Sequence, residues 1–364
     1  MKHIIVTVTN DLSYDQRMIK TCNTLVNNGY RVTLIGRKLP NSIALANKKF
    51  KQVRLGLLFK KGKLFYVEYN ITLFCYLLFA SFDAICSVDM DSLLPGILSA
   101  KIKGKKVIYD AHEYFSEVPE VIERPMVQNV WRRLEKWCIP KVNAAYTVSK
   151  SIGDILAEKH NKPFGLVRNM PNYIESKNQN NENEGFILYQ GALNVGRGIE
   201  EMIKAMHHVD AIFKIAGDGP IAKELRELVK QENLENKIEF LGFVEPAALK
   251  VLTKKAKIGV NLAQNLGLNY YYSLNNKFFD YVQAELPQLC INFPEFKRVN
   301  DEYNVAVLVD DLSTDNLSKE INKLLLSSSL YDSIKSNCSS AKLTLNWEKE
   351  TPVLLNIYDT VLNG

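Results

Sequence analysis

The feature that most constrains the fold is an alternation of strand-like and helix-like segments that stops once and then starts again. In the first half, apolar runs and helical patterns follow one another over residues 4–8, 18–27, 31–36, 106–109 and 144–148. In the second half they follow one another over residues 186–190, 199–208, 211–216, 220–231, 238–241, 258–262, 289–292 and 305–309. Strands that alternate with helices pair in parallel. The sequence therefore predicts an α/β protein with two Rossmann-like, doubly wound parallel sheets.

The point at which the alternation stops predicts the domain boundary. Residues 173–185 are mostly polar and offer little to bury. We therefore expect one domain over residues 1–172 and a second over residues 173–345. A chain of 364 residues is long enough for two cores, because single cores rarely grow beyond about 250 residues. Sheets of this kind bind ligands at the carboxyl ends of their strands, so the expected site is a cleft between the two domains.

Composition and cysteine usage indicate a soluble protein of a reducing compartment. Apolar residues make up 46% of the chain and charged residues 24%, and the mean hydropathy is −0.13. The six cysteines lie far apart, which favours reduced thiols over disulfides or zinc ligands. The N-terminus runs into polar Asn10 and Asp11 without the apolar core of a signal peptide. The most apolar stretch, residues 71–80, is half of the ~20 residues that span a bilayer. We expect a cytoplasmic protein without a transmembrane helix.

The net charge of +6 hides an asymmetry between the two halves. Residues 1–168 hold 26 Lys and Arg against 14 Asp and Glu, and the remaining residues hold 20 against 26. Nine basic residues lie between Arg37 and Lys63 with no acidic residue among them. This pattern favours an anionic surface or ligand at the N-terminal half, and a solvated basic face explains it equally well.

Two glycine-containing turns follow strands of the second half. The strand at 186–190 runs into Gly191-Ala192-Leu193-Asn194-Val195-Gly196-Arg197-Gly198, where glycines surround one cation before a helical pattern. Such a turn can cradle a phosphate, because backbone N–H groups at a helix start attract anions; glycines that serve only the turn are the alternative. The strand at 211–216 runs into Gly217-Asp218-Gly219-Pro220, with Pro220 expected as the first helical residue. The first strand has no glycine after it, which argues against a dehydrogenase.

A helix expected to start near Ser273 carries a second cation. Asn276 and Asp280 then share one face, while Phe278, Phe279 and Val282 can pack inward. Lys277 lies in the first turn, so the segment suits a diphosphate joined to a ribose. The alternative is an amphipathic helix whose Lys277 and Asp280 are exposed and without function.

These motifs, taken in order, resemble the retaining GT-B glycosyltransferases of family 4, also called glycosyl transferases group 1. Arg197-Gly198 resembles the basic-Gly pair that binds diphosphate, and residues 276–281 resemble the Asn-Lys-Leu-Phe-Glu-Tyr signature. The donor-binding residues that the resemblance implies are Gly191, Arg197, Gly217, Asp218, Gly219, Gly242, Phe243, Val244, Asn276, Lys277 and Asp280. Three positions depart from the family pattern: Ala192 stands for an arginine, Asp280 for a glutamate, and Tyr272 lies near the other glutamate.

The first half contributes the acceptor side of the implied enzyme. Asp15-Gln16-Arg17 resembles an Asp-x-Arg element, and residues 109–113 resemble a strand end that presents a histidine. The resemblance implies acceptor-side roles for Asp15, Arg17, His112 and Glu113. It implies catalytic roles for His112, Arg197, Lys277 and Asp280. Residues 346–364 resemble the family's C-terminal helix, which crosses back to the first domain.

The implied activity is transfer of a hexosyl-type sugar with retention of configuration. The donor is a nucleoside-diphosphate sugar, and the acceptor is a saccharide or lipid-linked saccharide, in surface polysaccharide or glycolipid assembly. We expect no bound cofactor, no metal and no nucleic acid partner, with weak attachment to an anionic membrane at the inner face of the cell membrane. An epimerase of the same shape and a binding subunit without activity remain alternatives. A third, minor alternative is a metal bound by the Asp-x-Asp sequence at Asp89 and Asp91.

Overall fold

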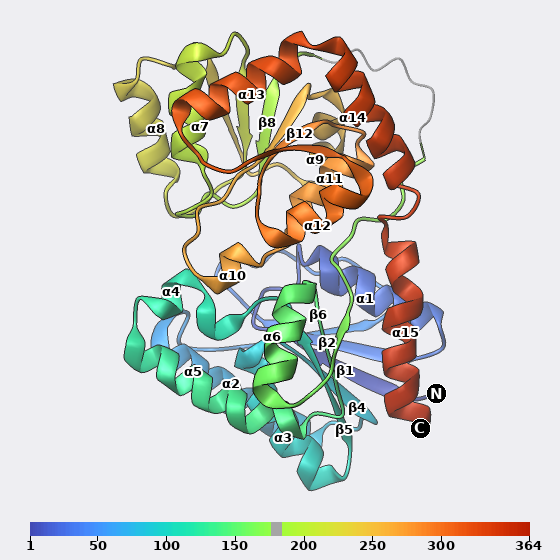
Figure 1. Ribbon diagram of the computed structural model, residues 1–364. Helices are drawn as coiled ribbons and strands as arrows, with labels where there is room; N and C mark the ends of the chain where they lie inside the picture. Colours follow the sequence, from blue (N-terminus) through green and yellow to red (C-terminus); the bar gives the residue numbers. More distant parts are fainter. Residues whose placement is uncertain (176–183) are drawn as a thin grey trace. The chain divides into compact units, whose positions relative to one another are not determined.

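The computed structural model describes residues 1–175 and 184–364, and the chain divides into two compact units (Figure 1). Unit 1 comprises residues 1–168 and 351–364, and unit 2 comprises residues 169–350. The division falls at 168/169, beside the expected boundary at 172/173. Residues 176–183 of the expected polar linker lie outside the described residues.

Unit 1 is built on a seven-stranded parallel sheet in the order β3-β2-β1-β4-β5-β6-β7. Its strands are β1 (His3–Thr7), β2 (Arg31–Arg37), β3 (Lys51–Leu55), β4 (Ala84–Val88), β5 (Lys106–Ala111), β6 (Ala144–Thr147) and β7 (Phe164–Leu166). Its helices are α1 (Gln16–Asn27), α2 (Gly62–Phe79), α3 (Met90–Lys103), α4 (Pro119–Ile122), α5 (Pro125–Cys138) and α6 (Lys150–His160). The central strands β1 and β4 are mostly apolar and buried along almost their whole length, as in a sheet covered by helices on both faces.

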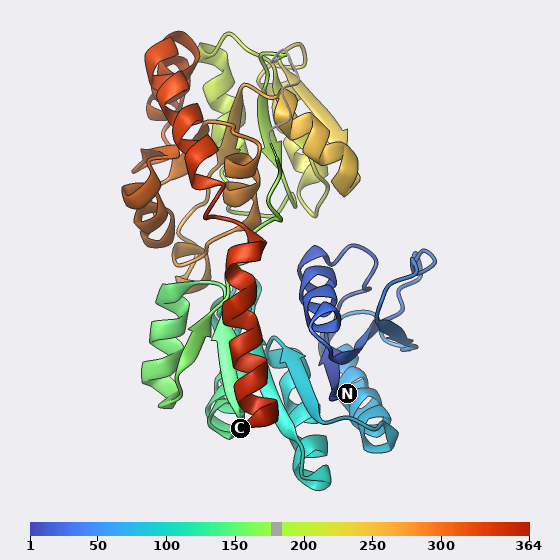
Figure 2. The same ribbon diagram turned by 90° about the vertical axis from the view of Figure 1, so that its right-hand side faces the viewer.

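Helix α15 (Trp347–Asn363) ends the chain, and its residues from Thr351 onward belong to unit 1. This part of α15 lies along the sheet of unit 1 in both ribbon views (Figures 1 and 2). The Tyr358 hydroxyl lies 3.3 Å from that of Tyr146 in β6, and the Tyr30 hydroxyl donates to Asp359. The last helix therefore completes the core of the first unit.

Unit 2 is built on a six-stranded parallel sheet in the order β10-β9-β8-β11-β12-β13. Its strands are β8 (Ile187–Gln190), β9 (Phe213–Ala216), β10 (Ile238–Gly242), β11 (Ile258–Asn261), β12 (Gln288–Ile291) and β13 (Ala306–Val309). Its helices are α7 (Ile199–Ala205), α8 (Ala222–Gln231), α9 (Pro246–Lys255), α10 (Leu268–Tyr271), α11 (Asn276–Gln283), α12 (Pro294–Tyr303), α13 (Thr314–Leu326) and α14 (Ser328–Ala341). The strand order reverses on either side of β8, and such a switch point is where doubly wound sheets bind ligands.

The prediction of two doubly wound parallel sheets is confirmed, and two expected helix starts are wrong. Helix α8 begins at Ala222, so Pro220 precedes the helix instead of opening it. Helix α11 begins at Asn276 and not near Ser273, because Asn275 caps it: the Asn275 side-chain oxygen accepts from the Phe278 N–H at 3.3 Å.

Residues 71–79 of the apolar stretch form the second half of α2, and Ala80 is its C-cap. Within residues 1–175 and 184–364, no helix is both long and apolar enough to cross a membrane. All six cysteines are free thiols, and five of them are buried.

Candidate functional site

Two loops at the carboxyl ends of β8 and β9 pack directly on each other. The Gly191 N–H donates to the Ala216 carbonyl at 3.0 Å, and the Leu193 N–H donates to the Asp218 carbonyl at 3.0 Å. A Cβ atom on Gly217 would lie 1.8 Å from the Gly191 oxygen, and one on Gly219 would lie 2.4 Å from the Leu193 oxygen. Only glycine allows this approach of two backbones. The two predicted glycine turns are therefore hydrogen-bonded to each other and form a single packed loop pair.

Arg197 is held at the end of the first of these loops. Gly198 follows it with a φ of 66° as the N-cap of α7, and a Cβ atom there would lie 2.6 Å from the Leu262 Cβ. The Arg197 guanidinium carbon lies 4.4 Å from the centre of the Tyr270 ring. Within the part of the chain that the structure describes, this guanidinium forms no ion pair with a carboxylate.

Lys277 is a buried cation of unit 2. It is the second residue of α11, and only 9% of it is exposed. Its Nζ lies 3.9 Å from the centre of the Tyr189 ring, and a Cβ atom on Gly191 would lie 3.6 Å from Nζ. Burial, reinforced by the Arg197 charge, holds the pKa of Lys277 well below its ordinary value. No carboxylate of the described residues pairs with it. The interpretation of Lys277 as an exposed surface residue is therefore wrong.

Asp280 lies one turn after Asn276 on α11 and is tied to β8. The Gln190 side-chain amide donates to Asp280 Oδ2 at 3.1 Å, and Gln190 Oε1 accepts from the Thr253 hydroxyl at 2.8 Å. Gln190 is only 4% exposed, so a buried side chain holds the Asp280 carboxylate in place. Gln190 was not among the predicted site residues; its position as the last residue of the strand before the glycine turn is the signal that marks it. Asn276 is exposed at the start of the helix.

Three of the predicted donor-binding residues, Gly242, Phe243 and Val244, lie at the end of β10, next to β9 in the sheet. Gly242 ends the strand with a φ of 66°, a conformation that favours glycine. Phe243 is 60% exposed, whereas Val244 packs on a small cluster of apolar side chains. The turn thus presents an aromatic ring at the same edge of the sheet as the glycine loops.

In unit 1, the predicted acceptor-side residues meet at the carboxyl end of β5. Arg17 Nη2 donates to Asp110 Oδ1 at 2.9 Å, and Arg17 Nε donates to His112 Nε2 at 2.8 Å. Asp110 is fully buried, which alone would raise its pKa, but the positive charge of Arg17 outweighs burial and lowers the pKa to about 2. Asp110 was not among the predicted site residues, although it lies within the motif at residues 109–113.

Three groups surround the side chain of His112. Its Nε2 lies 3.0 Å from Asp110 Oδ2 as well as 2.8 Å from Arg17 Nε, and one nitrogen cannot accept and donate at once. Donation from Arg17 places the proton on Nδ1, which lies 3.8 Å from Asp89 Oδ2. The backbone N–H of His112 donates to Asp89 Oδ1 at 2.8 Å. The histidine is therefore a fixed group at the strand end.

Asp15 and Glu113 are the other two predicted acceptor-side residues. Asp15 is the N-cap of α1, and its Oδ1 accepts from the Met18 N–H at 2.9 Å. It also accepts from the side-chain amide of Asn10. Glu113 follows His112 and is half-buried. Its negative charge acts on Asp89, whose pKa burial raises well above its ordinary value.

The two residues of the Asp-x-Asp sequence lie at the turn from β4 into α3. Asp91 is 6% exposed; its Oδ2 accepts from the Thr9 hydroxyl at 2.7 Å, while Oδ1 has no hydrogen-bond partner in the described part of the chain. Burial raises the pKa of Asp91 to about 7. Among the described residues, no group of three or more His, Cys, Asp or Glu side chains is placed to hold a metal ion.

Sequence families match both halves of the chain. Glycosyltransferase Family 4 matches residues 16–177, and Glycosyl transferases group 1 matches residues 172–340. An uncharacterized glycosyltransferase from Methanocaldococcus jannaschii is 37% identical over 83 residues, which are 22% of this chain and 21% of that protein. The match thus spans about a fifth of the length of this curated relative.

Solved structures show the same fold at low sequence identity. Sucrose-phosphate synthase from Thermosynechococcus elongatus has a TM-score of 0.84 at 15% identity, with 100% of both chains covered. HepE from Anabaena, in complex with UDP-glucose, has a TM-score of 0.76 at 12% identity, again with 100% of both chains covered.

Proposed function

The chain belongs to the family 4 glycosyltransferases with the GT-B fold, and we propose that it transfers a sugar from a nucleoside-diphosphate sugar to a saccharide or lipid-linked saccharide. The observation that carries the donor assignment is the buried Lys277 beside Arg197. An unpartnered buried cation is costly. A bound diphosphate would supply the anion that both side chains lack.

The geometry of unit 2 supports a role for each part of the donor. Lys277, Arg197 and the N–H groups at the start of α11 would stabilise the negative charge that develops on the leaving diphosphate. Asp280, held by Gln190, would accept hydrogen bonds from the ribose hydroxyls. Phe243 would contact the base. HepE, which shares the fold, was solved in complex with UDP-glucose, which is consistent with a nucleotide sugar as donor here.

In this proposal, unit 1 binds the acceptor through His112 and Arg17 at the end of β5. Transfer retains the anomeric configuration, and His112 contacts the transferred sugar instead of acting as the main base. Asp15 and Glu113 line the acceptor side, although Asp15 also caps α1. We propose a role in the assembly of surface polysaccharide or glycolipid, without a bound metal or cofactor, because cations of the protein itself face the diphosphate site.

Two substitutions support alternatives to transfer. Ala192 and Asp280 stand where the resemblance predicts arginine and glutamate, so a protein that binds a nucleotide sugar without turning it over is a second candidate. A nucleotide-sugar epimerase would share the donor site and need no acceptor.

Titration calorimetry with uridine, guanosine and adenosine diphosphates, without divalent metal, tests the donor site. We expect one of them to bind the wild-type protein, and Arg197→Ala to weaken that binding. No binding of any nucleoside diphosphate, with or without magnesium, would refute the assignment.

A further inference from the structure

Helix α2 carries apolar side chains around its whole circumference. Its buried side is formed by Phe65, Tyr69, Leu73 and Leu77. On its outer side the exposed fractions are 58% for Leu64, 55% for Val67, 59% for Ile71 and 92% for Phe79. These positions are spaced by three or four residues or multiples of four, so they form one stripe. A helix that is apolar all round is normally buried, and an exposed apolar stripe of this length marks a contact surface.

The loop before α2 extends the stripe with two more apolar side chains. Leu58 is 85% exposed and Phe59 is 44% exposed. Glu68 holds the loop, because its two carboxylate oxygens accept from the Leu58 and Phe59 N–H groups, both at 2.8 Å. Arg37 Nη1 donates to the Lys60 carbonyl at 3.0 Å. The backbone is thus fixed on both sides while the apolar side chains remain in solvent.

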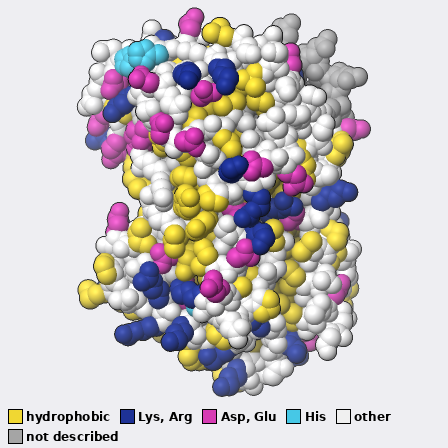
Figure 3. Space-filling model, viewed as in Figure 1, with side chains coloured by type: hydrophobic (Ala, Val, Ile, Leu, Met, Phe, Trp, Pro, Cys, Tyr) yellow, Lys and Arg dark blue, Asp and Glu magenta, His cyan; other side chains and the backbone are white. Residues whose placement is uncertain are grey.

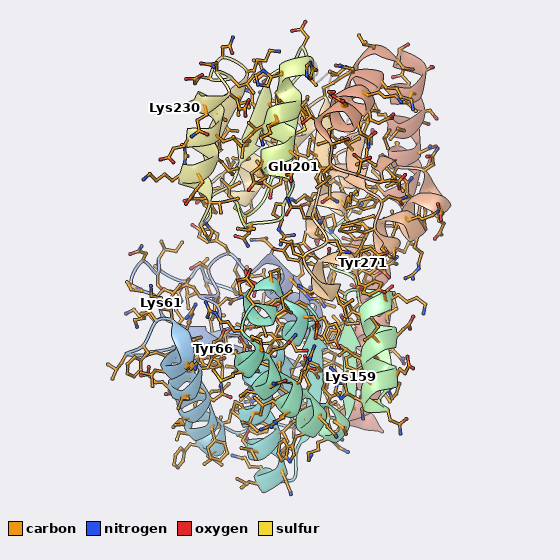
Figure 4. All side chains as sticks on the ribbon, turned by 60° about the vertical axis from the view of Figure 1, so that its left-hand side comes forward. Lys61, Tyr66, Lys159, Glu201, Lys230 and Tyr271 are labelled. Atoms are coloured by element: carbon orange, nitrogen blue, oxygen red, sulfur yellow. The ribbon has the colours of Figure 1, made fainter. Side chains whose placement is uncertain are left out.

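The charges around the stripe are positive. Lys61 and Lys63 are exposed where α2 begins, and Figure 4 shows Lys61 at this end of the helix. Between residues 37 and 67 the sequence has nine Lys and Arg and no Asp or Glu. The carboxylate of α2, Glu68, is already occupied by the loop.

A neighbouring helix continues the basic surface. The Tyr66 ring, which points toward α5 in Figure 4, lies 5.4 Å from the Trp131 ring of that helix. Lys and Arg side chains gather over α5 in the space-filling view (Figure 3). Arg133 and Lys136 of this helix are exposed.

We propose that the face formed by the α2 stripe and the Leu58–Phe59 loop docks on an anionic lipid bilayer, with α2 lying in the plane of the interface. Apolar side chains flanked by lysines suit the boundary between anionic headgroups and acyl chains. A second copy of the chain is disfavoured as the occupant, because a symmetric contact would bring the same lysines together. The proposal adds a surface to the proposed function, since a lipid-linked acceptor would lie in that bilayer, but docking itself needs no substrate.

Vesicle flotation tests the proposal with a matched pair of double variants of the full chain. The first is Leu58→Ser with Leu64→Ser. The control is Leu326→Ser with Val251→Ser in unit 2, because these residues have the same exposed fractions, 85% and 58%. The probes are vesicles of phosphatidylcholine alone and of phosphatidylcholine with phosphatidylglycerol.

We expect the wild type and the control to float with the anionic vesicles and much less with the neutral ones, and high salt to weaken the binding. The Leu58/Leu64 variant should bind the anionic vesicles at least tenfold more weakly. Equal flotation with both vesicle types, or an equal loss in both variants, would overturn the proposal. So would a dimer in sedimentation analysis that the Leu58/Leu64 variant abolishes while vesicles bind no form of the protein.

Nucleoside-diphosphate binding, measured on the same samples, separates this proposal from the proposed function. The Leu58/Leu64 variant should bind the nucleotide as the wild type does, because the donor residues lie in unit 2. If the Leu58/Leu64 variant loses vesicle binding but binds the nucleotide normally, the docking proposal is supported. Vesicle binding in a protein that binds no nucleotide would leave docking standing and refute the donor site.

Discussion

Replacing Lys277 by methionine should weaken nucleotide binding without weakening the fold. Lys277 is buried over Tyr189 with no carboxylate partner among the described residues. In the free protein, methionine removes a desolvation cost of several kcal/mol per buried ion and a cation–π contact of about 0.5–2 kcal/mol. The first term is at least as large as the second, so the melting temperature of the free protein should stay or rise. A charge-assisted hydrogen bond to phosphate is worth about 1.5–3 kcal/mol, so affinity for the diphosphate should fall roughly 10- to 150-fold.

Calorimetry and thermal unfolding of the same samples check both halves of this prediction. The control is Lys223→Met, which removes a lysine of unit 2 whose side chain is 86% exposed. It should leave both the affinity and the melting temperature as they are. A Lys277→Met protein that melts several degrees lower and binds nucleotide normally would show that the lysine is structural and refute the reasoning.

The lowered pKa of Lys277 gives the binding a pH dependence with a fixed sign. The diphosphate favours the charged ammonium, so binding raises this pKa and takes up a proton when the pH lies between the pKa values of the free and bound states. Affinity should therefore fall as the pH rises through that window. Calorimetry in buffers of different ionisation enthalpy should report proton uptake in the wild type and none in Lys277→Met. Uptake that is equal in the two proteins would assign the proton to another group.

The remaining predictions concern a close backbone contact in unit 2, an ion pair in unit 1 and the removal of divalent metal. Gly217→Ala places a Cβ atom 1.8 Å from a backbone oxygen, so unit 2 should lose about 1–3 kcal/mol or more in urea unfolding, while Gly56→Ala, with no atom within 4 Å, should cost little; equal losses would contradict this. Asp110→Asn removes the negative charge that is paired with buried Arg17 and should cost about 3–5 kcal/mol, against less than about 1 kcal/mol for exposed Asp154→Asn. Because the pKa of Asp110 is about 2 in the folded protein, the ion pair stabilises the fold above the unfolded-state pKa of Asp110, and this stabilisation is lost as the pH falls through about 2. If the wild type and Asp110→Asn unfold alike at pH 7, the pairing is refuted. Transfer activity should survive EDTA, and activity that EDTA abolishes and manganese restores would favour the Asp-x-Asp alternative.

The sequence predicted the parts of the fold whose signals are local. Strands flanked by turns were predicted within one or two residues, as with the run at 258–262 and β11 (Ile258–Asn261). Strand β4 was missed because it follows a long apolar helix, so no change of periodicity separates them. Strand β3 is an edge strand that contains two charged residues, Lys51 and Arg54. Strand β7 has only three residues. Both lack the apolar run that marks a buried strand.

The sequence predicted the identity of the site residues better than their environments. Lys277 was expected in the first turn of a helix, which is confirmed, but its burial depends on the loop at Gly191, which lies far away in the sequence. The same holds for Arg17 and Asp110, which are 93 residues apart, and for Gln190 and Asp280, which are 90 apart. Pairings of this kind are made by the fold, and no single motif contains them.

The most direct test of the central claim is release of nucleoside diphosphate from a nucleotide sugar, measured with and without a saccharide or lipid-linked acceptor. We predict that release by the wild type requires the acceptor, and that Arg197→Ala and Lys277→Ala each lower its rate ~100-fold or more. His112→Ala should lower the rate while nucleotide binding persists, because His112 belongs to unit 1. Release at the wild-type rate in both the Arg197 and Lys277 variants would contradict the account.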